Sequence, residues 1–210
     1  MKIWLVILFI FLGTFNALAQ THKLLFKTNK GNFKVLLYDF TPKHQQLILY
    51  AIKNKMYHDA LFNRVIENFV VQGGEHDVDI AEQEKALQPS ERYRLPAEFD
   101  SRAFHKMGAL GAGRDENDDK ASFLNQIYFV VGKIVTNEEL NALELKKGIK
   151  FSENQREIYL KNGGLPRLDN DYTVFGEVYE GLEVLLKISK VQTNEKDYPL
   201  EKIIFEITEI

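Results

Sequence analysis

The stretch over residues 61–74, LFNRVIENFVVQGG, constrains the fold of this chain more than any other. It contains two short apolar runs that Glu67 and Asn68 separate, and both runs are rich in Val, Ile and Phe. Short runs of β-branched and aromatic residues are typical of buried strands. The stretch therefore predicts two adjacent strands inside a packed β structure.

Arg64 and Gln72 interrupt this apolar pattern. A guanidinium is always charged, and burying one without a partner is costly, so such a residue usually lines a wet surface or a functional site. An exposed barrel face with the stems of both side chains lying along it is the commoner arrangement. The combination of Arg64 and Gln72 with Phe69 and the pair Gly73-Gly74 favours a site.

These residues resemble the signature of the cyclophilin family of peptidyl-prolyl cis-trans isomerases, which runs approximately F-H-R-V-I-x-x-F-x-x-Q-G-G. The one departure is Asn63, where histidine is usual. Residues 95–99 resemble the I-P-A-E-F of bacterial members, and residues 121–130 and 168–178 resemble two further family strands. The resemblance runs from Leu24 to Ile210, apart from residues 75–94 and one inserted segment.

The resemblance implies a mainly β fold, a closed antiparallel β-barrel capped by two helices. One helix is expected to begin at Thr41-Pro42, with the threonine as its cap, and the other to cover residues 182–188. Residues 75–94 are polar and without periodicity, and they are expected to form a loop.

Residues 135–165 depart most from a minimal cyclophilin. Thr136 with Glu139, and Ser152 with Gln155, form capping-box patterns, and each opens a helical run that ends at glycine. We therefore expect an inserted helical hairpin, acting as a packed lid or buttress, that can be removed without unfolding the barrel. A partner-docking surface is the alternative.

Residues 1–19 have the pattern of a secretory signal peptide. Lys2 precedes an apolar run, and Ala17-Leu18-Ala19 forms a small-x-small cleavage site. The run is short for the roughly 20 residues that cross a bilayer, and no cysteine is present for lipid attachment. We expect a bacterial protein with one cyclophilin-like domain over residues 20–210, exported to the periplasm or secreted, and free of the membrane after cleavage.

Net charge and the spacing of potential ligand residues limit the classes of partner and cofactor that this chain is expected to bind. The formal net charge is −3 and no basic stripe is present, which argues against nucleic acid as a partner. The five histidines show no metal-ligand spacing, and no phosphate-binding glycine loop or hydrolase nucleophile motif is found. We expect a monomer without metal or cofactor, whose partners are proline-containing polypeptides.

The resemblance also implies the chemistry. Rotation about an X–Pro bond has a barrier of about 20 kcal/mol, and a cation that donates to the proline nitrogen helps only in the twisted state. In the family this catalytic role belongs to the residue matched by Arg64. The matched substrate-binding residues are Phe69, Val70, Gln72, Gly113, Arg114, Gln126, Tyr128, Arg167, Leu168 and Tyr172.

Three departures from the family pattern bear on this site. Tyr128 stands where phenylalanine is usual, and its hydroxyl needs a partner if it is buried. Arg167 stands where eukaryotic members have tryptophan, and the bulky residues 123–125 are expected to reshape the groove beside Gln126. A catalytically weak cyclophilin-like chaperone or peptide-binding module is therefore the rival interpretation, and a lipocalin-type ligand barrel is a more distant one.

The mature protein is predicted to begin at Gln20. Signal peptidase cleaves after small-x-small patterns, and Ala17-Leu18-Ala19 is the pattern at the end of the leader. The intact mass of the exported protein, measured after expression of the full chain, tests this start. A retained leader or an added lipid mass would contradict it.

Overall fold

The computed structural model describes residues 22–210, so the predicted signal peptide lies outside the described residues. Fifteen elements follow in chain order, two of them short 3₁₀ turns: β1 (Lys23–Thr28), β2 (Gly31–Leu37), α1 (Pro42–Lys53), β3 (Ala60–Val65), β4 (Val70–Gly74), α2 (Asp77–Gln83), η1 (Pro89–Glu91), β5 (Ala109–Ala112), β6 (Gln126–Val130), α3 (Asn137–Lys147), α4 (Glu153–Asn162), η2 (Pro166–Leu168), β7 (Val174–Glu180), α5 (Leu182–Ile188) and β8 (Ile203–Glu209).

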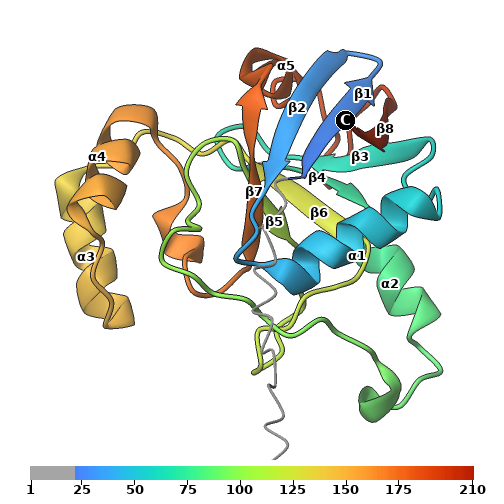
Figure 1. Ribbon diagram of the computed structural model, residues 1–210, viewed down its shortest axis with the longest axis horizontal. Helices are drawn as coiled ribbons and strands as arrows, with labels where there is room; N and C mark the ends of the chain where they lie inside the picture. The colour runs from blue at the N-terminus through green and yellow to red at the C-terminus, as the bar shows by residue number, and fades with distance from the viewer. Residues whose placement is uncertain (1–21) are drawn as a thin grey trace, which may run out of the picture.

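The strands form a closed barrel in the order β1-β2-β7-β5-β6-β4-β3-β8, and every neighbouring pair is antiparallel. β8 closes the barrel because it pairs with β1 on one side and with β3 on the other. The predicted mainly β barrel is confirmed. Figure 1 shows α1 and α5 at opposite ends of it.

Aromatic side chains fill the barrel interior. Phe26, Phe33, Phe62, Phe129 and Phe205 are all buried, and their rings stack or meet edge to face with centroids 4.4–6.2 Å apart. The same cluster includes Ile48 and Ala51 of α1 and Leu185 and Ile188 of α5. Because this interior is packed with side chains, it is a core and not a ligand cavity.

The N-terminus of α1 is capped differently from the prediction. Thr41 precedes the helix, but its side chain makes no capping hydrogen bond. Instead, the carboxylate of Glu98 accepts from the backbone N–H groups of Lys43 at 3.0 Å and His44 at 2.9 Å. A carboxylate at a helix N-terminus also interacts favourably with the helix dipole. The loop that carries Glu98 is thereby fastened to α1.

His44 extends this contact into the interior. Its Nδ1 lies 2.8 Å from the Glu98 carboxylate, and its Nε2 lies 3.1 Å from the hydroxyl of Ser122. Burial lowers the pKa of the His44 imidazole, although Glu98 opposes this shift. His44 and Ser122 are both inaccessible to solvent, so their geometry serves packing and not nucleophilic chemistry.

The prediction of a loop over residues 75–94 was wrong. The segment contains α2 and η1, and His76 begins α2 by accepting a hydrogen bond from the backbone N–H of Val78 at 3.2 Å. α2 is short and buries only Ile80, so it leaves no apolar periodicity to detect. Its position depends on tertiary contacts, including the stacking of His76 on Tyr198, with ring centroids 4.7 Å apart.

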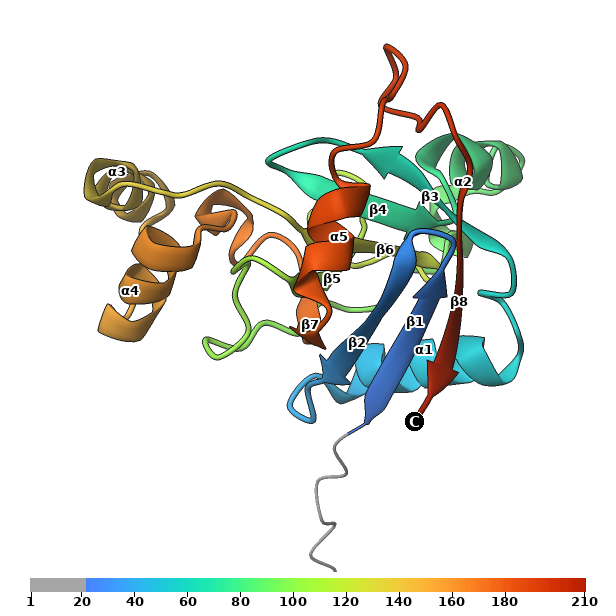
Figure 2. The ribbon, with the colours of Figure 1, turned by 90° about the horizontal axis from the view of Figure 1, so that it is seen from above.

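Two helices form where the capping boxes predicted them. Both boxes are present, and α3 ends at Gly148 in the left-handed conformation. Figures 1 and 2 show α3 and α4 side by side at one flank of the barrel. We call these two helices and the turn between them the α3–α4 hairpin. Their own small core contains Leu140, Phe151, Tyr159 and also Phe104, which comes from a barrel loop.

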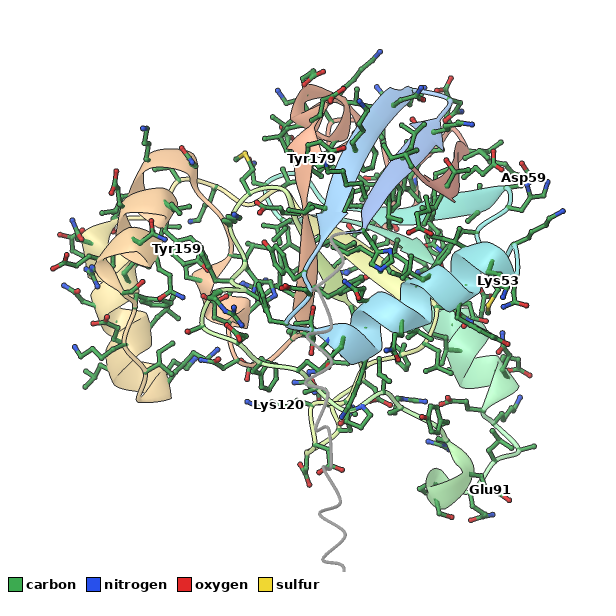
Figure 3. The ribbon with its side chains drawn as sticks, in the orientation of Figure 1. Lys53, Asp59, Glu91, Lys120, Tyr159 and Tyr179 are labelled. Carbon is green, nitrogen blue, oxygen red and sulfur yellow. The ribbon has the colours of Figure 1, made fainter. Side chains whose placement is uncertain are left out.

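Two contacts of the hairpin with the rest of the protein argue against its removal without consequence for the barrel. Phe104 would lose its packing partners if the hairpin were removed. Tyr159, which Figure 3 labels on α4, also donates a hydrogen bond to the buried Asp169, outside the hairpin, at 2.6 Å. Excision would therefore expose an apolar surface and leave a buried carboxylate short of a donor.

Replacing Glu98 by alanine is expected to lower the free energy of unfolding by about 2 kcal/mol. The substitution leaves two N–H groups of α1 and the ring of His44 without their acceptor. Urea unfolding measures the loss. We expect the midpoint urea concentration to fall while the dependence of the unfolding free energy on urea concentration stays unchanged.

Thr41→Val is the matched control for Glu98→Ala. Its side-chain hydroxyl contributes only a 3.3 Å hydrogen bond to the carbonyl of Tyr38, so we expect a loss below about 1 kcal/mol. A larger loss for Thr41→Val than for Glu98→Ala would contradict the assignment of the cap.

Candidate active site

A pocket of about 150 Å³ opens on the outer surface of the barrel. The structure brings together around it all eleven side chains or glycines that the sequence singled out, together with one it did not, Asp77. The lining comprises Arg64, Phe69, Val70, Gln72, Asp77, Gly113, Arg114, Gln126, Tyr128, Arg167, Leu168 and Tyr172. Strands β3, β4 and β6 contribute five of these residues, α2 contributes Asp77, η2 contributes Arg167 and Leu168, and the other four lie in segments between elements.

Arg64 stands on β3 opposite Gln72 of β4, beside an irregularity in the register of the two strands. Its side chain is 30% exposed, and its Nε lies 3.5 Å from the carboxylate of Asp197. Asp197 belongs to the segment before β8, and its backbone carbonyl accepts from Val65 N–H at 2.9 Å. The guanidinium thus keeps donors available while a carboxylate restrains its position.

Gln72 is buried, and its side-chain Nε2 has no hydrogen-bond partner within residues 22–210. A buried amide donor without a partner is unfavourable by roughly 1–3 kcal/mol. An acceptor placed in the pocket would remove that cost. Gln72 therefore borders the pocket with a side-chain donor that residues 22–210 leave unused.

Gln126 is already held by the protein. Its Nε2 donates to the carboxylate of Asp77 at 2.6 Å and to the carbonyl of Glu75 at 3.1 Å. Asp77 stands in the first turn of α2, inside the segment expected to be a loop, and no sequence pattern pointed to it. Its contact connects α2 to the pocket wall.

Two glycines let side chains approach the strand closely. A Cβ at Gly113 would come within 1.9 Å of the Gln126 amide oxygen, and one at Gly111 within 2.3 Å of the Tyr128 ring. The Gly113 backbone is fully used, since its N–H donates to Gln126 and its carbonyl accepts from Phe123. The Gly113 backbone therefore has no free N–H with which to pair with a peptide.

Tyr128 has the partner that its burial requires. Its hydroxyl lies 2.7 Å from Nε2 of His105, and the Nδ1 of His105 lies 2.6 Å from the carboxylate of Asp169. Burial raises the pKa of the Tyr128 hydroxyl well above its ordinary value, so the phenol keeps its proton. The phenol ring lies in the pocket lining while its polar end is bonded within the protein.

Two arginines lie over aromatic rings of the pocket. The guanidinium of Arg167 stands 4.6 Å from the centroid of Phe69, and that of Arg114 stands 4.9 Å from the centroid of Tyr172. Arg114 is further held by the carbonyls of Asp171 and Asp115 at 2.6 and 2.7 Å. These stacked cations make the rim positive around an apolar floor.

Phe123 does not line this pocket. It lies in a neighbouring hollow of about 470 Å³, where the Arg94 guanidinium stacks on its ring at 4.6 Å from the centroid. Glu84 and Asp115 hold Arg94 from two sides, at 2.5 and 2.8 Å. The bulk at Phe123 therefore changes the neighbouring hollow and not the pocket itself.

Residues 22–210 contain no cluster of three or more His, Asp or Glu side chains arranged to hold a metal ion. Within the same residues no helix is long and apolar enough to cross a membrane.

Comparisons with known proteins agree with the barrel and with the motifs around the pocket. A family model described as "Cyclophilin type peptidyl-prolyl cis-trans isomerase/CLD" matches residues 23–209. A protein of Staphylococcus saprophyticus named "Putative peptidyl-prolyl cis-trans isomerase" is 32% identical, over 90% of this chain and 91% of its own. A protein of Staphylococcus haemolyticus with the same name is 30% identical, over 90% of each chain.

Solved structures show the same fold. A cyclophilin-type peptidyl-prolyl cis-trans isomerase of Cryptosporidium parvum has a TM-score of 0.66 at 17% identity, over 91% of this chain and 98% of its own. The structure of that protein in the presence of the dipeptide Ala-Pro has a TM-score of 0.63 at 18% identity, over 90% and 98%. Since the family model covers nearly all of the described residues, the chain belongs to the cyclophilin-type peptidyl-prolyl cis-trans isomerase family.

Proposed function

We propose that this protein accelerates rotation about X–Pro bonds in unfolded or extended exported proteins, and that Arg64 stabilises the twisted amide. The observation that carries the proposal is that one small pocket is bordered by Arg64, by the Gln72 amide, whose donor has no partner within residues 22–210, and by the apolar side chains of Phe69, Val70 and Leu168. A pocket of about 150 Å³ suits one small ring better than a drug-sized ligand, whose sites measure roughly 300–1,000 Å³.

The residues have separate roles in this mechanism. The proline ring rests among Phe69, Val70, Tyr128 and Leu168, and Gln72 donates to a substrate carbonyl. Twisting the X–Pro bond makes the proline nitrogen pyramidal and more basic, and the Arg64 guanidinium then donates to it. This hydrogen bond forms only in the twisted state, so it lowers the barrier and does not merely increase binding. The reaction needs no nucleophile, metal or cofactor.

The backbone of Arg114 is the proposed pairing edge for the peptide. Gly113 is occupied, whereas within residues 22–210 the Arg114 N–H and carbonyl make no hydrogen bond. An extended peptide would add to this edge as a short strand. The exported location remains our proposal, and it rests on the leader sequence.

The rival function is a peptide-binding chaperone with little turnover. The neighbouring hollow at Phe123 supports it, because a wide surface beside the pocket holds more of an extended chain than catalysis alone requires. The availability of the Arg64 donors favours the isomerase, since a pure binding groove has no need of a cation at the proline nitrogen.

Arg64→Ala is expected to lower kcat/KM for a proline-containing peptide by well over tenfold, mainly through kcat. The guanidinium acts on the twisted amide, and a group that acts only in the transition state affects kcat when it is removed. A coupled or NMR-based isomerisation assay measures the change, with circular dichroism as the check on folding.

Arg102→Ala is the matched control for Arg64→Ala. Arg102 is an exposed arginine that pairs with Asp100 and does not line the pocket, so turnover should remain at the wild-type rate. Near-normal turnover of a folded Arg64→Ala variant would assign the function to the binding rival.

Cyclosporin is expected to inhibit this protein roughly ten- to a hundredfold less strongly than an Arg167→Trp variant. In family members with tryptophan at this position, the indole N–H donates to the drug and the ring packs on it. Those contacts contribute about 1 kcal/mol and roughly 0.5–1.5 kcal/mol. The exposed Arg167 would have to lose water against an apolar macrocycle.

The drug titration is run on both forms with one peptide substrate. Turnover should be less affected than inhibition, because a short peptide does not rely on the contact that the drug makes with residue 167. Nanomolar inhibition of the wild type, or no gain from tryptophan, would show that Arg167 does not occupy the drug-contacting position.

A further inference from the structure

Four buried side chains connect the α3–α4 hairpin to the floor of the pocket. Tyr159, Asp169, His105 and Tyr128 are 0%, 6%, 1% and 4% exposed. Tyr159 donates to one carboxylate oxygen of Asp169 at 2.6 Å, and the ring and backbone N–H of His105 contact the other at 2.6 and 2.9 Å. His105 meets the hydroxyl of Tyr128 at 2.7 Å.

The direction of each hydrogen bond follows from the groups present. An ionised carboxylate can only accept, so Tyr159 O–H and His105 Nδ1–H both donate to Asp169. When the His105 ring carries its single proton on Nδ1, Nε2 accepts a hydrogen bond from the Tyr128 hydroxyl. Burial raises the pKa of both tyrosines well above the ordinary value, which keeps both donors protonated.

The hairpin also holds the pocket wall. Lys147, in the last turn of α3, donates to the backbone carbonyls of Arg167, at 2.9 Å, and of Asp169. It also donates to the carboxylate of Asp171 at 2.7 Å. These acceptors flank Leu168 in the sequence, and Leu168 lines the pocket. The Lys147 side chain is only 15% exposed, and its ammonium group therefore fastens η2 to the hairpin.

We propose that the α3–α4 hairpin positions the proline pocket, with the Tyr159–Asp169–His105 chain fixing the Tyr128 ring and Lys147 fixing the segment that carries Leu168. Tyr159, Asp169, His105 and Lys147 are positioning residues, since none of them lines the pocket. Gly111 leaves the Tyr128 ring no spare room on the strand side, so a shift at its hydroxyl end displaces the pocket floor. The hairpin is thus part of the substrate-binding apparatus.

Tyr159→Phe tests the chain, because it removes one hydroxyl and leaves the ring in the hairpin core. The proline ring contacts the floor in both the ground state and the transition state, so a displaced floor weakens both equally. We expect KM for the blocked peptide Ala-Ala-Pro-Phe to rise roughly three- to tenfold, with kcat within about twofold of wild type. Lys147→Met should act in the same direction.

Phe151→Leu is the matched control. Phe151 packs edge to face on Tyr159, with centroids 5.8 Å apart, but its side chain has no hydrogen-bonding group and so is not a link in the hydrogen-bond chain. It should lower the stability of the hairpin and leave KM unchanged. Equal changes of KM for Phe151→Leu and Tyr159→Phe, or an unchanged KM in Tyr159→Phe, would reduce the hairpin to a structural support.

A double-mutant cycle tests whether Tyr159 affects the pocket through the hydroxyl of Tyr128. In a Tyr128→Phe background the chain ends at His105, so adding Tyr159→Phe should change KM no further. Additive effects of the two substitutions would mean that Tyr159 acts by another path and would overturn the proposal.

The inference rests on the proposed function. Two further measurements do not depend on turnover, so they separate a failure of this inference from a failure of the proposed function. The first is the affinity for the same peptide, measured by calorimetry. A wild type that binds the peptide without isomerising it would refute the isomerase, while weaker binding by Tyr159→Phe would still support the hairpin's role.

The second readout is the proton NMR signal of the buried His105 Nδ1–H, which needs no peptide. Its short hydrogen bond to Asp169 and its burial should give a downfield, slowly exchanging resonance. The resonance should shift in Tyr159→Phe and stay in place in Phe151→Leu. An unshifted signal in Tyr159→Phe would contradict the coupling, whatever the protein does to peptides.

Discussion

Closure of the barrel is the constraint on which the other features depend. β8 pairs with both β1 and β3, so the barrel formed by residues 22–210 has no edge strand. Five phenylalanines fill that interior, and α1 and α5 complete its two ends. A filled barrel cannot hold a ligand inside, so the pocket has to form on the outer surface. Arg64 and Gln72 are available there because the adjacent residues Val65 on β3 and Val71 on β4 lie in the core.

The local parts of the structure could be predicted from the sequence. Strand alternation, the two capping boxes and the glycine stops all depend on residues a few positions apart, and each formed where expected. The residues that line the pocket, apart from Asp77, could be named from the sequence because each of them matches a position in a family motif. The sequence also predicted that the Tyr128 hydroxyl, if buried, would need a hydrogen-bond partner. Nothing in the sequence indicated that His105 would be that partner.

The features that the sequence did not reveal are contacts between distant residues. Glu98 caps α1 from more than fifty positions away, and a threonine stood in the expected place. Asp77 supports Gln126 from a helix too short to produce a periodic pattern. The Asp169 carboxylate collects donors from a barrel loop and from α4. Polar residues of this kind do not show in hydrophobic periodicity, because their burial depends on partners that only the folded chain brings together.

The pairing of β1 with β8 has a consequence for how the chain folds. Leu24 lies opposite Glu209, so the last seam of the barrel joins segments separated by almost the whole domain. Contacts of such sequence separation require closing a long loop before any stabilisation is gained, and proteins dominated by them fold slowly. Until β8 is in place the phenylalanine core remains open along that seam. A nascent chain of this topology therefore cannot close its barrel until its final strand has been synthesised.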